Sequence, residues 1–243
     1  MEFRKMIQAL LFDINGTVTD ILTDEGRPEI YRTLSNFLDC RGVKIAPETI
    51  QTRYFELIRR QKAESDEAYP EFDVIEVFRE LLLENGVAAG TAALAPLLSE
   101  IFRAASRFKL ELYPGVAELL PELAQRYRLA AVSDGQSQWA RSEMNSVGIA
   151  PYFDPVIISG DCGFRKPDRR MFDRALAQLR LGPEEAVFVG NDMYRDVRGA
   201  HKAGMKTVFF ASNQGDHDFH GVEPDYIIRD FRELPRALEF LAR

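Results

Sequence analysis

The chain of 243 residues has few of the features that mark secreted, membrane-spanning or zinc-binding proteins. It contains only two cysteines, Cys40 and Cys162, whose spacing fits neither a zinc site nor a redox pair, so we expect reduced thiols and a cytoplasmic protein. No apolar run approaches the roughly 20 residues of a membrane helix. The first apolar run ends without a small-residue cleavage site, which argues against a signal peptide.

Basic residues are also too few for a general polyanion-binding protein. Lys and Arg number 31 against 38 Asp and Glu, which gives a formal net charge of −7 and argues against nucleic acid or an anionic membrane as partner. Neither common glycine-rich nucleotide loop is present, so a kinase or a dehydrogenase is disfavoured. The remaining composition, 46% hydrophobic and 28% charged, is typical of a globular protein with one large or two modest domains.

The first part of the chain predicts one strand followed by a helical bundle. Ile7 to Phe12 is a short apolar run typical of a buried strand. From about Glu29 to Phe108, apolar residues recur on one face of four successive segments, as in a small four-helix bundle. Prolines suit two helix starts and glycines suit two helix ends: Pro28, Pro47, Gly42 and Gly86.

Beyond Tyr113 the pattern changes to short apolar runs that alternate with helical stretches. This alternation predicts βαβ units, with a parallel sheet covered by helices on both faces. We expect strands at Leu129–Val132, Val156–Ile158, Ala186–Val189, Thr207–Phe210 and Tyr226–Ile228. We expect helices at Val116–Ala124, Trp139–Val147, Arg170–Leu179, Asp196–Ala203 and Leu234–Leu241.

Together these patterns predict an α/β fold with a helical insertion. Residues 1–19 and 110–243 should form a doubly wound parallel-sheet core. Residues 20–109 should form a separate four-helix bundle, because the first strand needs the later strands as sheet neighbours. Either a monomer or a homodimer is compatible with this organisation.

Polar residues follow four of the predicted strands directly. In an open parallel sheet, ligands bind at the carboxyl ends of the strands, so these residues should meet at one edge. The first two strands end in Asp13-Ile14-Asn15-Gly16-Thr17 and Ser133-Asp134-Gly135. The later segments are Arg165-Lys166-Pro167-Asp168 and Gly190-Asn191-Asp192, with Asp196 four residues further on.

These residue types predict a site for a phosphate group and a divalent metal ion. Carboxylate oxygens, such as those of Asp13 and Asp192, are ligands that Mg²⁺ shares with a substrate phosphate. Lys166 can neutralise the phosphate, while the Ser133 hydroxyl and backbone N–H groups hold phosphoryl oxygens. Asp13 could then attack phosphorus and form an aspartyl phosphate.

The order and position of the four motifs resemble the haloacid dehalogenase superfamily, in the subfamily with a helical cap after the first strand. The resemblance covers nearly the whole chain and implies a Rossmann-like core, a Mg²⁺ cofactor and a small phosphorylated substrate. The resemblance also implies residue roles. Asp13 would be the nucleophile and a metal ligand, Asp192 a further metal ligand, and Lys166 the cation that steadies the phosphate. Ser133, Asp134 and Gly135 would bind the phosphate at their strand end, Asp196 would lie behind the metal ligands or act through water, and Thr17 would support the first loop.

One residue departs from the phosphatase pattern of this superfamily. Two positions after the nucleophile, the usual aspartate protonates the leaving group and then activates water. Here the position holds Asn15, whose carboxamide can do neither. Its backbone carbonyl can still bind the metal ion, so the resemblance implies a metal-dependent but slow phosphatase.

Two other functions stay open from the sequence. The dehalogenase branch of the superfamily also lacks the second aspartate, and in that reaction Asp13 would attack the carbon of a 2-haloacid without a metal ion. The acidic residue Asp192 favours the metal-dependent phosphatase over this alternative. The third function is a non-catalytic chain that binds a metal ion and a phosphorylated metabolite.

Overall fold

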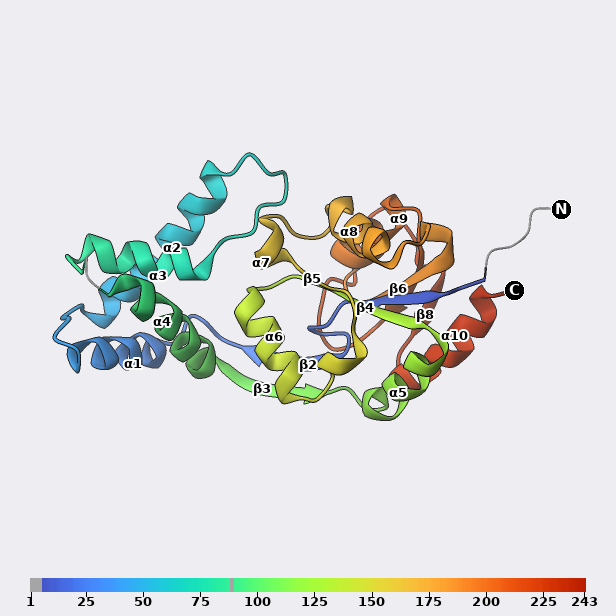
Figure 1. The fold of residues 1–243 in the computed structure, drawn as a ribbon, viewed down its shortest axis with the longest axis horizontal. Helices are drawn as coiled ribbons and strands as arrows, with labels where there is room; N and C mark the ends of the chain where they lie inside the picture. The colour runs from blue at the N-terminus through green and yellow to red at the C-terminus, as the bar shows by residue number, and fades with distance from the viewer. Residues whose placement is uncertain (1–5, 88–89) are drawn as a thin grey trace. The chain divides into compact units, whose positions relative to one another are not determined.

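Two compact units make up the chain (Figure 1). The computed structural model describes residues 6–87 and 90–243. The core unit combines the N-terminal residues up to Asp20 with Leu110–Arg243, and the helical unit comprises Ile21–Lys109. Within the described ranges, no helix has both the length and the apolar character needed to cross a membrane.

The core unit is built on a parallel sheet of six strands, which confirms the predicted α/β class. The strands are β1 (Ala9–Phe12), β4 (Arg128–Ser133), β5 (Val156–Ile158), β6 (Ala186–Gly190), β7 (Lys206–Phe210) and β8 (Tyr226–Ile228). Their order is β5-β4-β1-β6-β7-β8, so the first strand lies inside the sheet. Phe12 of β1 lies between Ala131 of β4 and Val189 of β6. The residues that follow these three strands therefore meet at one edge.

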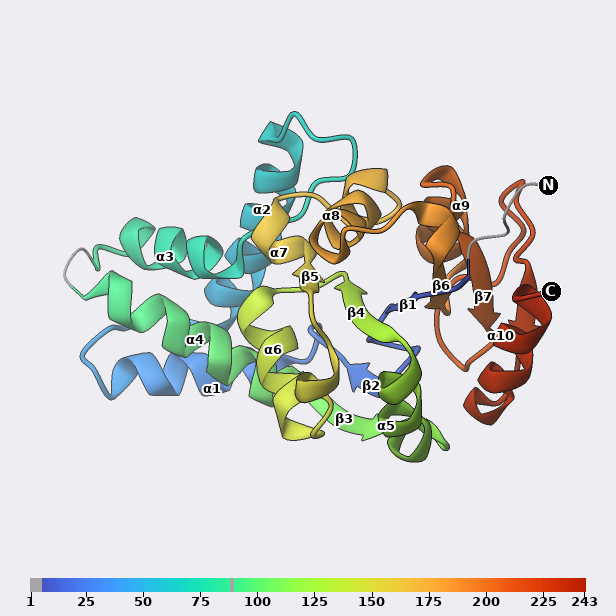
Figure 2. The ribbon, with the colours of Figure 1, turned by 45° about the vertical axis from the view of Figure 1, so that its right-hand side comes forward.

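Helices cover both faces of this sheet. They are α5 (Val116–Arg126), α6 (Ser137–Ser146), α8 (Arg169–Leu179), α9 (Arg198–Lys202) and α10 (Leu234–Leu241). Leu10 and Phe12 pack with α5 and α10, whereas Ala9 and Leu11 pack with α8 and α9. Figures 1 and 2 show these two helical layers on either side of the sheet. Because both faces are buried, the strands are almost wholly apolar and the polar residues lie at their ends.

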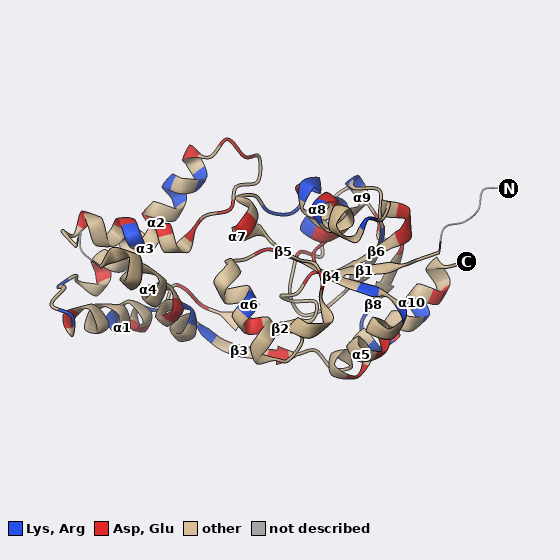
Figure 3. Cartoon of the chain, in the orientation of Figure 1, with Lys and Arg blue, Asp and Glu red and all other residues tan. Residues whose placement is uncertain are grey.

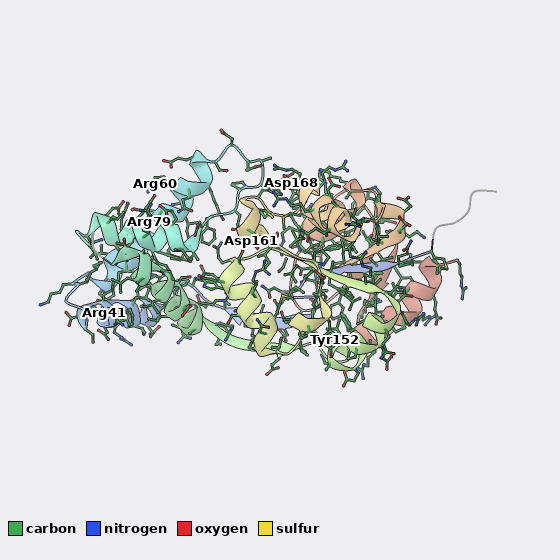
Figure 4. All side chains as sticks on the ribbon, viewed as in Figure 1. Arg41, Arg60, Arg79, Tyr152, Asp161 and Asp168 are labelled. Atoms are coloured by element: carbon green, nitrogen blue, oxygen red, sulfur yellow. The ribbon has the colours of Figure 1, made fainter. Side chains whose placement is uncertain are left out.

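The helical unit packs four helices around aromatic side chains. They are α1 (Pro28–Asp39), α2 (Pro47–Glu64), α3 (Val74–Glu84) and α4 (Thr91–Ser106). The rings of Tyr54 and Phe102 lie 4.5 Å apart at their centroids, and Phe78 packs against both. Proline begins α1 and α2, as predicted, because its fixed φ suits the first helical position. Figure 3 marks charged residues along these helices, and Arg60 and Arg79, which Figure 4 labels, are exposed.

One strand pair was not predicted. β2 (Thr19–Thr23) and β3 (Arg107–Leu112) form a separate two-stranded sheet. The helical stretch expected to reach Phe108 therefore ends at Ser106. The sequence does contain a signal for β3, because charged and apolar residues alternate along Arg107–Leu112, and a period of two favours a strand.

The helix predicted at Asp196–Ala203 begins earlier and in another form. After β6, Met193–Val197 forms a π-helical turn, and only then does α9 begin. Asp192 caps the turn by accepting hydrogen bonds from two of its backbone N–H groups. Within the turn, Asp196 points back to the strand end, where its Oδ2 accepts from two further backbone N–H groups. Such π-turns occur frequently at functional sites.

Candidate active site

A buried lysine held between two carboxylates forms the centre of the candidate site. Asp13 directly follows β1, and Asp196 lies in the π-helical turn after β6. The Nζ atom of Lys166, from the loop before α8, lies 2.6 Å from Asp13 Oδ1 and 2.7 Å from Asp196 Oδ1. All three residues are buried. The structure thus joins three residues that the sequence analysis singled out.

Burial and crowding of charge shift the pKa values of this group. Burial, with a contribution from Asp13, raises the pKa of Asp196 to about 7, although the charge of Lys166 opposes the shift. Burial alone would lower the pKa of Lys166, but the charges of Asp13, Asp196 and Asp134 outweigh it and raise that pKa. Lys166 is therefore positively charged at neutral pH.

Replacing Lys166 with methionine is expected to lower the free energy of unfolding of the metal-free chain by about 3–5 kcal/mol, because two buried carboxylates lose their cation. Asp196 has a folded pKa of about 7 against an ordinary value of 3.8, so its stabilising contribution is complete below the ordinary value and is lost as pH rises through about 7. The charge of Lys166 opposes this shift, and the variant loses that opposition, so its deficit should be larger above pH 7, where the Asp196 carboxylate is ionised, than near pH 4.

Urea denaturation at the two pH values measures this deficit, with Lys202→Met as the matched control because Lys202 is an exposed lysine of α9. A Lys166→Met chain as stable as the control variant would contradict the ion-pair assignment.

A second chain of contacts leads from Asp13 to an asparagine that the sequence analysis did not select. The Thr17 hydroxyl lies 3.1 Å from Asp13 Oδ2 and 3.1 Å from Asn191 Oδ1. Asn191 is buried, and its carboxamide fills the space where a Cβ on Gly16 or Gly215 would lie, 2.4 and 2.7 Å from Nδ2. Both glycines also have φ near +90° (90° and 87°), which favours glycine. Asn191 is thus a further residue of the site, and its only signal was its place after β6.

The end of β4 carries a buried hydroxyl, that of Ser133. The Ser133 Oγ atom neither accepts nor donates a hydrogen bond among the described residues. Its two successors are engaged: the Gly135 N–H donates to Ser159 Oγ at 2.8 Å, and Asp134 Oδ1 accepts from the Lys166 N–H at 3.0 Å. A buried unpaired hydroxyl costs free energy, which indicates a place for a polar ligand next to β1.

Asn15, two residues after Asp13, is partly buried. Its Oδ1 accepts a hydrogen bond from Thr19 Oγ1 at 3.2 Å. Its Nδ2 donates to no residue in the part of the chain that the structure describes. An aspartate in this position would therefore keep the acceptor and lose no hydrogen bond.

Both carboxylate oxygens of Asp192 accept hydrogen bonds within the protein. Its Oδ1 accepts from the N–H groups of Tyr194 and Arg195, and its Oδ2 accepts from the Arg195 guanidinium and from the N–H of Asp216. Burial opposes ionisation, but the hydrogen bond and charge of Arg195 lower the pKa of Asp192 below its ordinary value. Its role as a metal ligand stays a prediction.

The oxygen donors at this edge fit a magnesium ion. Among residues 6–87 and 90–243, no three Asp, Glu, His or Cys side chains are grouped closely enough to hold a metal ion by themselves. Mg²⁺ usually takes only one or two protein carboxylates and keeps water and substrate phosphate as its other ligands. Asp13, the Asn15 carbonyl and Asp192 meet that requirement in donor type.

Sequence comparison relates the chain to known hydrolases. The model of the haloacid dehalogenase-like hydrolase family matches residues 10–210. A phosphoserine phosphatase of Thermus thermophilus is 36% identical over 159 residues, which is 65% of this chain and 62% of that protein, less than two thirds of its length. A glyceraldehyde 3-phosphate phosphatase of Pyrococcus furiosus is 29% identical over 98% of this chain and 95% of the length of that protein.

Solved structures share the fold. A 2-haloacid dehalogenase of Pseudomonas syringae matches with a TM-score of 0.70 at 22% identity, over 98% of this chain and 100% of that one. The Bacillus subtilis hydrolase YfnB, solved with bound magnesium, matches with a TM-score of 0.57 at 21% identity, over 97% and 100%. A phosphatase of Thermococcus onnurineus matches with a TM-score of 0.59 at 25% identity, over 95% and 97%.

Proposed function

The chain belongs to the haloacid dehalogenase-like hydrolase family, as its motifs indicated, and from that premise we propose a Mg²⁺-dependent phosphatase of small phosphorylated metabolites. The observation that carries the proposal is the buried Asp13 carboxylate, which pairs with Lys166 and follows the strand beside that of Ser133, whose hydroxyl has no hydrogen-bond partner among the described residues. A nucleophile, a cation and a free donor thus lie at adjoining strand ends. The relatives named phosphatases add support.

In the proposed reaction, an Asp13 carboxylate oxygen attacks the phosphorus of a phosphate monoester. The bond between phosphorus and the ester oxygen breaks, and its electron pair leaves with that oxygen. The leaving alcohol takes its proton from solvent, because Asn15 has none to give. Water then attacks the aspartyl phosphate, releases inorganic phosphate and restores the Asp13 carboxylate.

Other residues of the site hold the phosphate and the nucleophile in place. Lys166 offsets negative charge on the phosphoryl oxygens, and the Ser133 hydroxyl donates to one of them. Asp196 holds the Lys166 ammonium, and Thr17 holds the second oxygen of Asp13. A Mg²⁺ ion, held by Asp13, the Asn15 carbonyl and Asp192, would supply further positive charge at the phosphate.

Changing Asp192 to asparagine is expected to weaken Mg²⁺ binding at least about tenfold, because the ion loses a charged ligand. Asparagine is an equally good N-cap, so the turn should survive. The matched control is Asp230→Asn, since Asp230 also caps a helical turn and pairs with an arginine. Calorimetric titration with MgCl₂ compares the variants, and equal affinity for both would remove Asp192 from the metal site.

A screen of small phosphate monoesters with and without Mg²⁺ tests the proposed activity. Phosphoserine and glyceraldehyde 3-phosphate are the first substrates to try, because two relatives carry their names. Phosphate release that requires both Mg²⁺ and Asp13 is the expected result. A panel that yields no phosphate, even after Asn15→Asp, would contradict the proposal.

Asn15 also supports a second candidate, a 2-haloacid dehalogenase. In that reaction Asp13 attacks the carbon that bears the halogen, the carbon–halogen bond breaks, and halide leaves with the electron pair and needs no proton. Water then hydrolyses the resulting ester. Halide release from 2-chloropropionate in excess chelator would favour this candidate, whereas Mg²⁺-dependent phosphate release without it would favour the phosphatase.

A further inference from the structure

A second charged group lies at the same edge of the sheet, beside the Asp13–Lys166–Asp196 group. Asp134 follows β4, Arg165 belongs to the loop before α8, where Figure 3 shows basic residues, and Arg195 belongs to the turn after β6. The Asp134 Oδ2 atom lies 3.6 Å from Arg165 Nη2 and 3.7 Å from Arg195 Nη1. The phosphatase mechanism above gives neither arginine a role.

Both guanidinium groups have N–H donors that make no hydrogen bond to the described residues. Their distances to Asp134 make ion pairs but are too long for hydrogen bonds, and Asp134 Oδ2 accepts none within the described residues. Arg165 donates a hydrogen bond to no described side chain, while the Nε and Nη2 atoms of Arg195 contact Asp192 and its Nη1 atom donates to none. The two arginine side chains are 31% and 37% exposed. Asp134 therefore orients donors that a ligand from solvent can reach.

These donors lie near the reacting atoms. Arg165 directly precedes Lys166, whose Nζ contacts Asp13 and whose backbone N–H donates to Asp134. Arg195 directly precedes Asp196, whose Oδ1 atom contacts the same Nζ atom, and the Arg195 Nη2 atom lies 2.7 Å from Asp192 Oδ2. One small molecule could thus place its phosphate at Asp13 and a second group at the arginines.

We propose that Arg165 and Arg195 form a carboxylate subsite, so that the substrate is a small phosphate monoester that also carries a carboxylate. The inference rests on the proposed phosphatase function, which accounts for the phosphate. Two guanidinium groups and Asp134 leave one positive charge, which matches a carboxylate monoanion better than a second phosphate dianion. Asp192, which pairs with Arg195, is left out of this count because a bound Mg²⁺ would offset its charge in the proposed site. The planar guanidinium fork of Arg165 suits a carboxylate, which it binds through two parallel hydrogen bonds, and Arg195 adds one donor through Nη1.

Two substrates that differ only by a carboxylate test the subsite: O-phosphoserine and O-phosphoethanolamine. We expect the full chain to favour O-phosphoserine at least tenfold in kcat/KM, and Arg165→Gln to reduce this ratio about tenfold, equivalent to about 1.4 kcal/mol. Arg169→Gln is the matched control, because Arg169 is an exposed arginine paired with Asp173 at the start of α8. A ratio that Arg165→Gln leaves unchanged would overturn the subsite.

Binding of non-hydrolysable phosphonates separates failure of the subsite from failure of the phosphatase. With Mg²⁺ present, calorimetry should show phosphonoacetate binding at least tenfold more tightly than methylphosphonate, and Arg165→Gln should remove most of that advantage. Arg195→Gln should act alike, with its Mg²⁺ affinity measured in parallel because Arg195 also contacts Asp192. Equal affinity for the two phosphonates overturns the subsite and leaves the phosphatase standing. If neither binds, both proposals fail.

Discussion

Replacing Asp13 with asparagine is expected to abolish phosphate release, with a loss of about 10⁴-fold or more in kcat. The reason is chemical, because a neutral carboxamide oxygen is a poor nucleophile toward phosphorus and cannot give an aspartyl phosphate. Asparagine has nearly the same shape, and its oxygen can still accept from Lys166 or Thr17, which both contact Asp13 now. The chain should therefore fold while losing its chemistry.

Kinetics on an aryl phosphate measure this loss, since an aryl leaving group needs no proton. Asp173→Asn provides the control, because it removes one carboxylate from an exposed ion pair on α8. Thermal melting of both variants separates loss of folding from loss of chemistry. A folded Asp13→Asn chain with even a tenth of the original rate would remove Asp13 from the nucleophile role, whatever the other motifs do.

Replacing Asn15 with aspartate is expected to raise kcat on alkyl phosphates by about 10²–10⁴-fold, the usual contribution of general acid–base catalysis. At about 1.36 kcal/mol per decade this is about 2.7–5.4 kcal/mol of barrier. The substitution introduces a group that can protonate the leaving alkoxide and then activate water. It should fold without cost, because the Thr19 hydrogen bond needs only an acceptor at this position.

The gain should depend on the leaving group. An alkyl phosphate, whose leaving group needs a proton, should gain more than an aryl phosphate, whose aspartyl phosphate should instead persist in the original chain. Asn145→Asp, an exposed asparagine of α6, adds the same charge elsewhere and should change neither rate. Mass spectrometry must accompany the assay, since the Asn15-Gly16 pair is prone to deamidation to the same product. No gain on either substrate would show that position 15 is not the acid–base position.

The apolar pattern by itself was enough for the architecture of the core. Short apolar runs between turn residues predict strands, and Val156–Ile158 and Tyr226–Ile228 appear in the structure with the bounds that the pattern predicts, although Ile227 of the edge strand β8 is exposed. Proline at the start of α1 and α2 acts through its own φ, which no distant contact can alter. The same pattern brought Asp13, Ser133 and Lys166 to one edge of the sheet, because ligands of parallel sheets gather at strand ends.

The partners of each polar group depended on the tertiary structure. Along the sequence, Asp192 and Asp196 are an acidic pair four residues apart, and only the folded chain shows that Asp192 caps the π-helical turn while Asp196 pairs with Lys166. Asn191 gained its place only because two glycine-containing loops close around its carboxamide.

The meeting of Arg165 and Arg195 at Asp134 likewise joins three separate loops. Apolar burial is a property that each short segment carries in its own composition, whereas a hydrogen bond or ion pair needs two groups whose positions are set by different segments. The sequence therefore determined the fold and the edge at which we propose the chemistry, and the folded chain decided which side chains contact one another there.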